Sequence, residues 1–122
     1  MRRTSDYEKI TLCDQRAVKK HSGAVSDPLY DEKGIRENAK AMYEAFSWNK
    51  GFREYFAVKA EPNPFVIGIM QQEGCGFDCS SLTELMLAKA MGGRGNDIMF
   101  SSNDTPAEDF KLADELGAII NL

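Results

Sequence analysis

One lysine in this sequence has surroundings that could give its amine a chemical role. Lys59 lies near the end of the run YFAVKAEPNP, which covers residues 55–64 and is almost wholly apolar in its first half. Such a run is typical of a parallel strand that is covered on both faces. An enclosed amine loses its proton readily, and a neutral amine condenses with aldehydes. The run therefore predicts a Schiff-base lysine; the alternative is a lysine that reaches the surface at a strand end.

Size and charge limit the classes of function. The chain has 122 residues, enough for one modest domain, and its formal net charge is −4. An acidic balance argues against a nucleic-acid partner and gives no reason to expect a membrane surface. No apolar run approaches the roughly 18 residues that span a bilayer, and the N-terminus lacks the apolar core of a signal peptide. We therefore expect a cytoplasmic protein.

The cysteines do not predict a metal site. Cys75 and Cys79 are three residues apart, Cys13 lies far upstream, and the one histidine is His21. A zinc site needs more ligands at suitable spacing. We expect reduced and mostly buried thiols, and no metal.

The chain divides into a polar first part and a patterned second part. Residues 1–26 are mixed in charge, with at most a short helix over residues 7–20. A helix is expected from Asp31, and its apolar positions follow helical spacing and predict a core-facing stripe. That stripe consists of Ile35, Ala39, Met42, Tyr43 and Phe46.

After that helix, strands and helices alternate. Strands are expected over residues 55–60, 76–80, 98–102 and 118–122, and helices over 64–73, 81–91 and 105–116. The helix over 64–73 should turn Phe65, Val66, Ile69 and Met70 inward and stop at Gly74. Capping boxes are expected at Ser81–Glu84 and Thr105–Glu108, the second with Pro106 at the first helical position.

This alternation predicts right-handed βαβ units and a parallel sheet, either open and doubly wound or part of a barrel. The glycines at 74–76 and 92–95 match neither a dinucleotide-binding fingerprint nor a phosphate loop. We expect no nucleotide site at either segment.

Three segments carry a resemblance to a known family. They are YFAVKAEPNP, QQEGCGFDCSSLTEL and IMFSSNDTPAEDFKLADELGAIINL, and the likeness extends over residues 27–122. In order and spacing they resemble diaminopimelate decarboxylases. More broadly, they resemble the alanine-racemase-fold pyridoxal-phosphate decarboxylases that act on ornithine, arginine or diaminopimelate.

The resemblance implies a fold and a function. It implies an α/β protein that forms part of a parallel (β/α) barrel, about the first four strands of a TIM-like barrel. It also implies decarboxylation of an amino acid, first of all meso-diaminopimelate to L-lysine, with pyridoxal 5′-phosphate as cofactor and a homodimeric assembly. Lys59 matches the family's cofactor-binding lysine, and Asp78 and Glu84 match two carboxylates beside it. The alternative for Asp78 is a turn or cap residue, and for Glu84 the capping box itself.

The resemblance also predicts that this chain is an N-terminal fragment. A full barrel takes about 250 residues, and the family's stacking histidine, phosphate loop and C-terminal domain have no counterpart here. His21 is in the wrong place for the histidine, and Glu61 departs from the small polar residue of relatives. A catalytically inactive fragment, an interaction piece and a self-contained small domain remain alternatives.

Overall fold

The computed structural model describes residues 30–121. Residues 32–122 form one compact unit. The expectations for the short helix over residues 7–20, for Cys13 and for His21 therefore lie outside the described residues.

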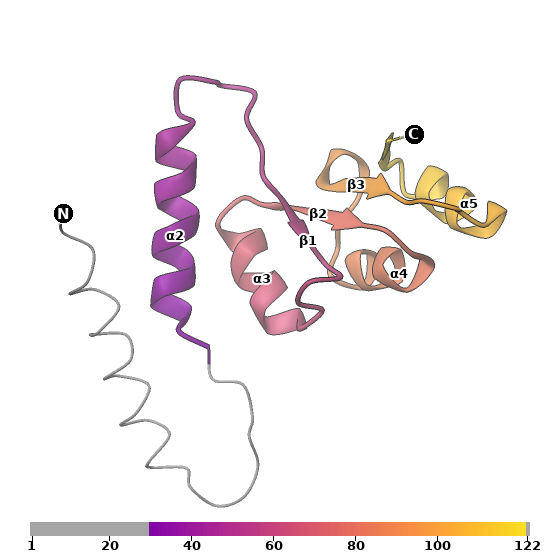
Figure 1. The fold of residues 1–122 in the computed structure, drawn as a ribbon, viewed down its shortest axis with the longest axis horizontal. Helices are drawn as coiled ribbons and strands as arrows, with labels where there is room; N and C mark the ends of the chain where they lie inside the picture. Colours follow the sequence, from indigo (N-terminus) through magenta and orange to yellow (C-terminus); the bar gives the residue numbers. More distant parts are fainter. Residues whose placement is uncertain (1–29, 122) are drawn as a thin grey trace, which may run out of the picture. The chain divides into compact units, whose positions relative to one another are not determined.

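Four short strands form one parallel sheet in sequence order (Figure 1). They are β1 (Tyr55–Ala57), β2 (Gly76–Cys79), β3 (Ile98–Ser101) and β4 (Ile119–Asn121). Each strand pairs in parallel with the next, so each connection crosses from the end of one strand to the start of its neighbour. The predicted alternation of strand and helix is confirmed.

The helices are α2 (Glu32–Ala45), α3 (Pro64–Gln72), α4 (Leu82–Ala90) and α5 (Ala107–Glu115), with a 3₁₀ turn, η1 (Gly95–Asp97), before β3. In the described part of the chain, no helix is both long and apolar enough to cross a bilayer.

One face of the sheet carries the hydrophobic core. Side chains alternate between the two faces along a strand, and the buried positions of the strands, apart from Gly76, all fall on one of them. This face meets apolar residues of α3, α4 and α5. The core comprises Val58, Ile67, Phe77, Cys79, Leu85, Ala88, Ile98, Phe100, Ala113 and Leu116. Cys75 and Cys79 are free, buried thiols, as predicted.

In the described part of the chain, the other face of the sheet is partly open to solvent. Its residues Ala57, Asp78, Met99 and Ser101 are only half-buried, and Ile119 is exposed. The expectation that β1 is covered on both sides is therefore wrong. In a closed barrel this would be the inner face, which is filled by side chains from all the strands.

Helix α2 packs on α3 through a narrower apolar stripe than the sequence predicts. Ala39 is buried, and Ile35, Met42 and Tyr43 are half-buried. Phe46 was expected in the core, but it follows the end of α2, is 41% exposed and stacks on Phe52 with ring centroids 4.3 Å apart.

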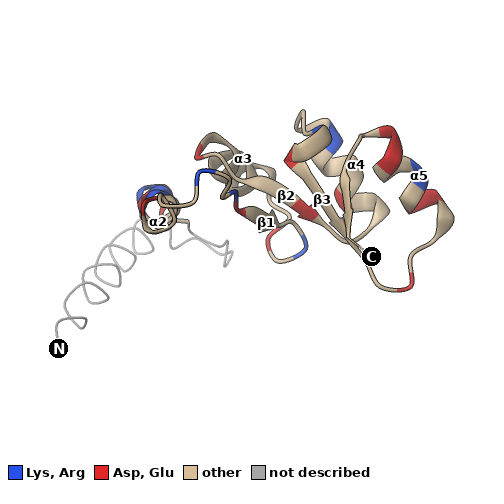
Figure 2. Ribbon diagram, turned by 90° about the horizontal axis from the view of Figure 1, so that it is seen from above, with Lys and Arg blue, Asp and Glu red and all other residues tan. Residues whose placement is uncertain are grey.

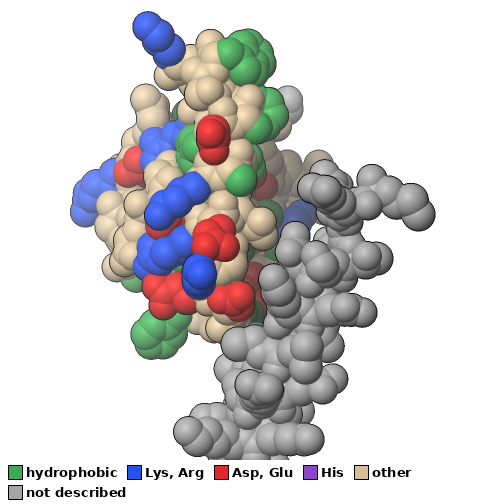
Figure 3. Space-filling model, turned by 90° about the vertical axis from the view of Figure 1, so that its left-hand side faces the viewer, with side chains coloured by type: hydrophobic (Ala, Val, Ile, Leu, Met, Phe, Trp, Pro, Cys, Tyr) green, Lys and Arg blue, Asp and Glu red, His purple; other side chains and the backbone are tan. Residues whose placement is uncertain are grey.

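The outer side of α2 carries charges of both signs, which Figure 3 shows interleaved. They include Glu32, Lys33, Arg36, Glu37 and Lys40. Arg36 joins α2 to the end of α3 through a 2.8 Å ion pair with Glu73. Figure 2 shows that the strands are largely uncharged and that basic and acidic residues lie mainly on the helices and loops.

Two local expectations for α3 and α5 are wrong. The first turn of α3 is capped by Asn63, whose Oδ1 accepts from the Phe65 amide over 3.0 Å, and Pro64 follows it as the first helical residue. Phe65 is nevertheless 85% exposed, while Ile67 is 1% exposed. A shift of one position turns a helical side chain by about 100°. Val66 is buried as predicted, and Ile67 lies in the core in place of Phe65.

The expected box at Thr105–Glu108 does not form. Pro106 is the N-cap of α5, and no side chain caps the helix there. By contrast, Gly74 ends α3 with a φ of 99°, in the left-handed region that glycine adopts most readily. The predicted stop at this position is confirmed.

Candidate functional site

The polar residues of the partly open face of the sheet gather where the strands end. Asp78 is the one charged residue within the four strands. Ser101 and Asn121 lie on the same face of β3 and β4, and the Asn121 amide donates to Ser101 Oγ over 3.3 Å. Enzymes with a parallel (β/α) barrel have their active sites at the C-terminal edge of the sheet. This edge is therefore the candidate site.

Lys59 lies at this edge, but its setting differs from the prediction. Strand β1 ends at Ala57, and Val58–Ala60 form a turn in which Lys59 is exposed. The expected enclosed lysine on the strand itself is wrong for this chain. No salt bridge in the described region includes Lys59. Its amine is accessible to an incoming carbonyl group.

Backbone register brings Lys59 close to Asp78. Ala57 pairs with Asp78, and the Val58 amide donates to the Asp78 carbonyl over 3.0 Å. Lys59 follows directly. The ammonium of Lys59 acts on the Asp78 carboxyl electrostatically and lowers its pKa. One predicted site residue, Lys59, therefore acts on another, Asp78.

The Asp78 carboxyl has a raised pKa. The largest cause is desolvation by burial, which disfavours the charged form; Lys59 opposes it, and Glu84 adds to the rise through like-charge repulsion. A carboxyl held in this way responds strongly to a nearby cation. The pKa of Asp78 therefore reflects its burial and the opposing charges of Lys59 and Glu84.

Glu84 is engaged at the start of α4. Its carboxylate accepts from the Ser80 amide over 2.7 Å and from the hydroxyls of Ser80 and Ser81 over 3.2 Å. Ser81 in turn accepts from the Glu84 amide over 3.4 Å, so the serine half of the predicted capping box forms, whereas Glu84 accepts from the Ser80 amide and not from that of the N-cap Ser81. These hydrogen bonds explain the position of the Glu84 carboxylate. Its charge also raises the pKa of Asp78.

Sequence reasoning missed two features of this edge. Asp109 in the first turn of α5 is buried, and its carboxylate accepts from the Leu82 amide over 3.1 Å. Its position on the core side of α5 was the available signal, because Asp109 is four residues before Ala113. The second feature is the pair Ser101–Asn121. The alternation of side chains between the two faces of a strand could have placed both residues on the face of Asp78.

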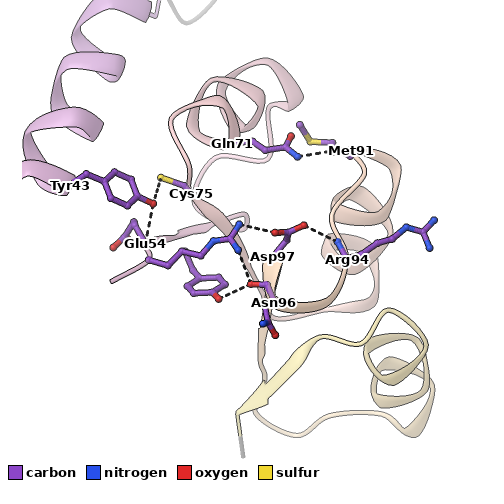
Figure 4. Close-up of polar contacts among 10 residues, drawn as sticks. Tyr43, Glu54, Gln71, Cys75, Met91, Arg94, Asn96 and Asp97 are labelled. Carbon is purple, nitrogen blue, oxygen red and sulfur yellow. Dashed lines mark hydrogen bonds and ion pairs between the residues drawn. The ribbon is translucent and has the colours of Figure 1, made fainter. Parts of the chain in front are cut away.

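At the opposite end of the sheet, polar side chains form a network of contacts (Figure 4). There Arg53 forms a 2.8 Å ion pair with Asp97, the Tyr55 hydroxyl donates to the Asn96 carbonyl, and Tyr43 lies beside Cys75. These contacts join β1 and the segment before it to η1, and α2 to the segment before β2. In the described region, no group of three or more His, Cys, Asp or Glu residues is arranged to hold a metal ion.

Comparison with known proteins assigns the family. Residues 32–120 match the model of the pyridoxal-dependent decarboxylases, in its pyridoxal binding domain. This chain belongs to the pyridoxal-dependent decarboxylases. The cofactor of this family is pyridoxal phosphate, as predicted.

Several relatives share this decarboxylase domain. Protein TabA of Pseudomonas amygdali pv. tabaci is 44% identical over 92 residues, which is 75% of this chain and 22% of TabA. The diaminopimelate decarboxylase of Methanothermobacter thermautotrophicus is 35% identical over 78% of this chain and 23% of its own length. The ornithine decarboxylase of Leishmania donovani is 34% identical over 75% of this chain and 13% of its own length. The chain thus spans less than a quarter of each of these relatives.

A solved structure supports the fold. The ornithine decarboxylase of Entamoeba histolytica superposes with a TM-score of 0.73 at 23% identity, over 93% of this chain and 36% of that one. The predicted fold class, an open partial α/β barrel, is confirmed.

The residues of this decarboxylase domain fit one end of pyridoxal phosphate. The cofactor carries an aldehyde, and Lys59 supplies an exposed amine on the same edge as a desolvated carboxyl. The described residues thus hold the groups for the aldehyde end of the cofactor.

Proposed function

We propose that this chain is the part of an amino-acid decarboxylase that anchors pyridoxal phosphate through Lys59. The observation that carries the proposal is that the pairing of β1 with β2 brings an accessible amine within electrostatic reach of the Asp78 carboxyl. Membership of the family supports it independently.

Each site residue has a distinct role in this proposal. The Lys59 amine would hold the cofactor's aldehyde, and the Asp78 carboxyl would lie beside that nitrogen as a source of negative charge. Glu84 holds Ser80 and the start of α4 in place. The chemistry that pyridoxal phosphate supplies when bound is withdrawal of electrons from the amino acid's α-carbon.

For the substrate we propose meso-diaminopimelate, with L-lysine as product, on the strength of the sequence motifs. Ornithine is the second candidate, because an ornithine decarboxylase and a diaminopimelate decarboxylase differ by only one per cent in identity to this chain. The relative with 44% identity carries a name that states no substrate. A homodimeric assembly and a cytoplasmic location remain predictions.

The test is to trap the cofactor on the protein. Pyridoxal phosphate is added, the visible absorption band is recorded, and borohydride reduction followed by peptide mapping locates the label. We expect the label on Lys59 and its loss in Lys59→Ala. Lys89→Ala is the matched control, since Lys89 is an exposed lysine on α4, and it should label as the wild type does.

Release of CO₂ from diaminopimelate, ornithine and arginine then distinguishes the substrates. Trapping on Lys59 without release from any of them would favour the catalytically inactive alternative. A band that persists in Lys59→Ala would remove Lys59 from the proposal.

A further inference from the structure

We propose that Asp109 is a positioning residue for the Lys59–Asp78 site. It reaches from α5 to the first turn of α4 and thereby holds the segment Ser80–Leu82 that follows Asp78. The inference rests on the proposed function for its link to the cofactor, but its geometric basis is independent of it.

The burial of Asp109 requires a partner. Among the described residues it is the one charged or polar residue in the buried class, with 6% of its surface exposed. A buried carboxylate without hydrogen bonds is costly. Asp109 Oδ2 accepts from the Leu82 amide over 3.1 Å.

That amide is one that α4 cannot satisfy by itself. Leu82 is the first residue of α4, and the first N–H groups of a helix have no partner within it. The N-cap Ser81 uses its hydroxyl on the Glu84 amide instead. The Leu82 amide has no acceptor within α4, so Asp109 supplies one from the neighbouring helix α5. The negative charge of Asp109 also interacts favourably with the positive N-terminal end of the α4 dipole.

Two carboxylates together hold the segment between β2 and α4. Glu84 accepts from the Ser80 amide over 2.7 Å, and Asp109 accepts from the Leu82 amide. Ser80 is two residues after Asp78, and α4 packs on β2. Loss of the Asp109 contact should loosen this segment and let water reach Asp78.

The test begins on the cofactor-free protein and uses three variants with one control. Asp109→Ala removes the acceptor, Asp109→Asn keeps an acceptor oxygen in place, and Asp109→Glu keeps the charge but displaces it by one methylene. Glu108→Ala is the matched control, because Glu108 is an exposed carboxylate in the same first turn of α5. The readouts are amide exchange at Ser80 and Leu82, the pKa of Asp78 by NMR, and the dissociation constant of pyridoxal phosphate.

In Asp109→Ala we expect about tenfold faster exchange at the Leu82 amide and about tenfold weaker cofactor binding, because the Leu82 amide loses its acceptor oxygen. The pKa of Asp78 should fall toward its ordinary value, since water then relieves the desolvation that raises it. Asp109→Asn should restore all three readouts to within about twofold, and Asp109→Glu should lie between them. Glu108→Ala should match the wild type.

The proposal is overturned if Asp109→Ala and Asp109→Glu speed exchange at Leu82 but leave the Asp78 pKa and the cofactor affinity as in Glu108→Ala. If Asp109→Ala does not fold, Asp109→Glu is compared with Asp109→Asn. The proposal is overturned if the two variants have the same Asp78 pKa and the same cofactor affinity while exchange at Leu82 differs. A failure of the proposed function looks different: no cofactor is trapped on wild-type Lys59, while the Asp78 pKa still responds to Asp109.

Discussion

Val58 donates its amide hydrogen to the carbonyl oxygen of Asp78 over 3.0 Å. This bond extends the β1–β2 ladder by one residue beyond β1, so that the turn carrying Lys59 begins beside the strand that carries the carboxyl. The electrostatic effect of Lys59 on Asp78 follows from this backbone contact.

The Asp78 carboxyl should report the charges around it. Lys59→Ala removes the cation that lowers its pKa, so the pKa of Asp78 should rise further; Glu84→Gln removes a like charge, so the pKa should fall. Side-chain carbon shifts followed by NMR across a pH titration measure both. Lys89→Ala, an exposed lysine on α4, should leave the titration unchanged. A pKa that falls in Lys59→Ala would contradict the geometry described above.

Asp78→Asn should stabilise the protein at neutral pH. Folding raises the pKa of Asp78, so the folded protein holds this proton more tightly than the unfolded chain, and the ionised form costs stability above the ordinary aspartate pKa. We expect a gain below about 1 kcal/mol at pH 7, because solvent screens a half-buried charge. The gain should shrink as the pH falls toward 4 in urea unfolding. Asp114→Asn, on the exposed side of α5, should show no such pH-dependent gain.

Cys79 should be chemically inert in the folded protein. Burial raises the pKa of its thiol to about 12, with the charges of Glu84 and Asp78 contributing. Since the thiolate is the reactive form, alkylation mapped by mass spectrometry should spare Cys79 at pH 8 and label it once the protein is unfolded. Rapid labelling of Cys79 under native conditions would show that the core face of β2 is accessible.

Gly76→Ala should destabilise the fold. A Cβ at this position would lie 2.6 Å from the Tyr55 ring and 2.7 Å from the Asp97 carbonyl oxygen, and both belong to the network at the N-terminal end of the sheet. We expect a loss of about 1–3 kcal/mol in the free energy of unfolding. Gly51→Ala is the control, since the nearest atom to its Cβ is 3.6 Å away. Equal effects of the two substitutions would argue against the tight contact.

Leu85→Ala should remove a central part of the core. Leu85 is fully buried on α4, whereas Met86, the next residue, is 58% exposed. Truncation should cost about 2–5 kcal/mol at Leu85, because a buried leucine leaves a cavity. The effect of Met86→Ala should stay within about 0.5 kcal/mol. Chemical denaturation of both variants measures the difference, and a small effect at Leu85 would place the core elsewhere.

The sequence by itself determined the elements and their order. Local signals in the sequence fix where helices and strands begin and end. They are the spacing of apolar residues, Asn63 before Pro64, the Ser81–Glu84 cap and the left-handed glycine at position 74. The strand ends also indicated which residues gather at one edge, since parallel strands end together.

Only the tertiary structure decided which faces are buried. Phe65 is exposed and Ile67 buried because the sheet meets one side of α3, and this depends on how the helix lies on the sheet. Lys59 is exposed because the chain turns at Val58–Ala60, directly after β1, and Asp109 is buried because α5 brings it to the start of α4. Such contacts join residues far apart in sequence, and no local pattern specifies them.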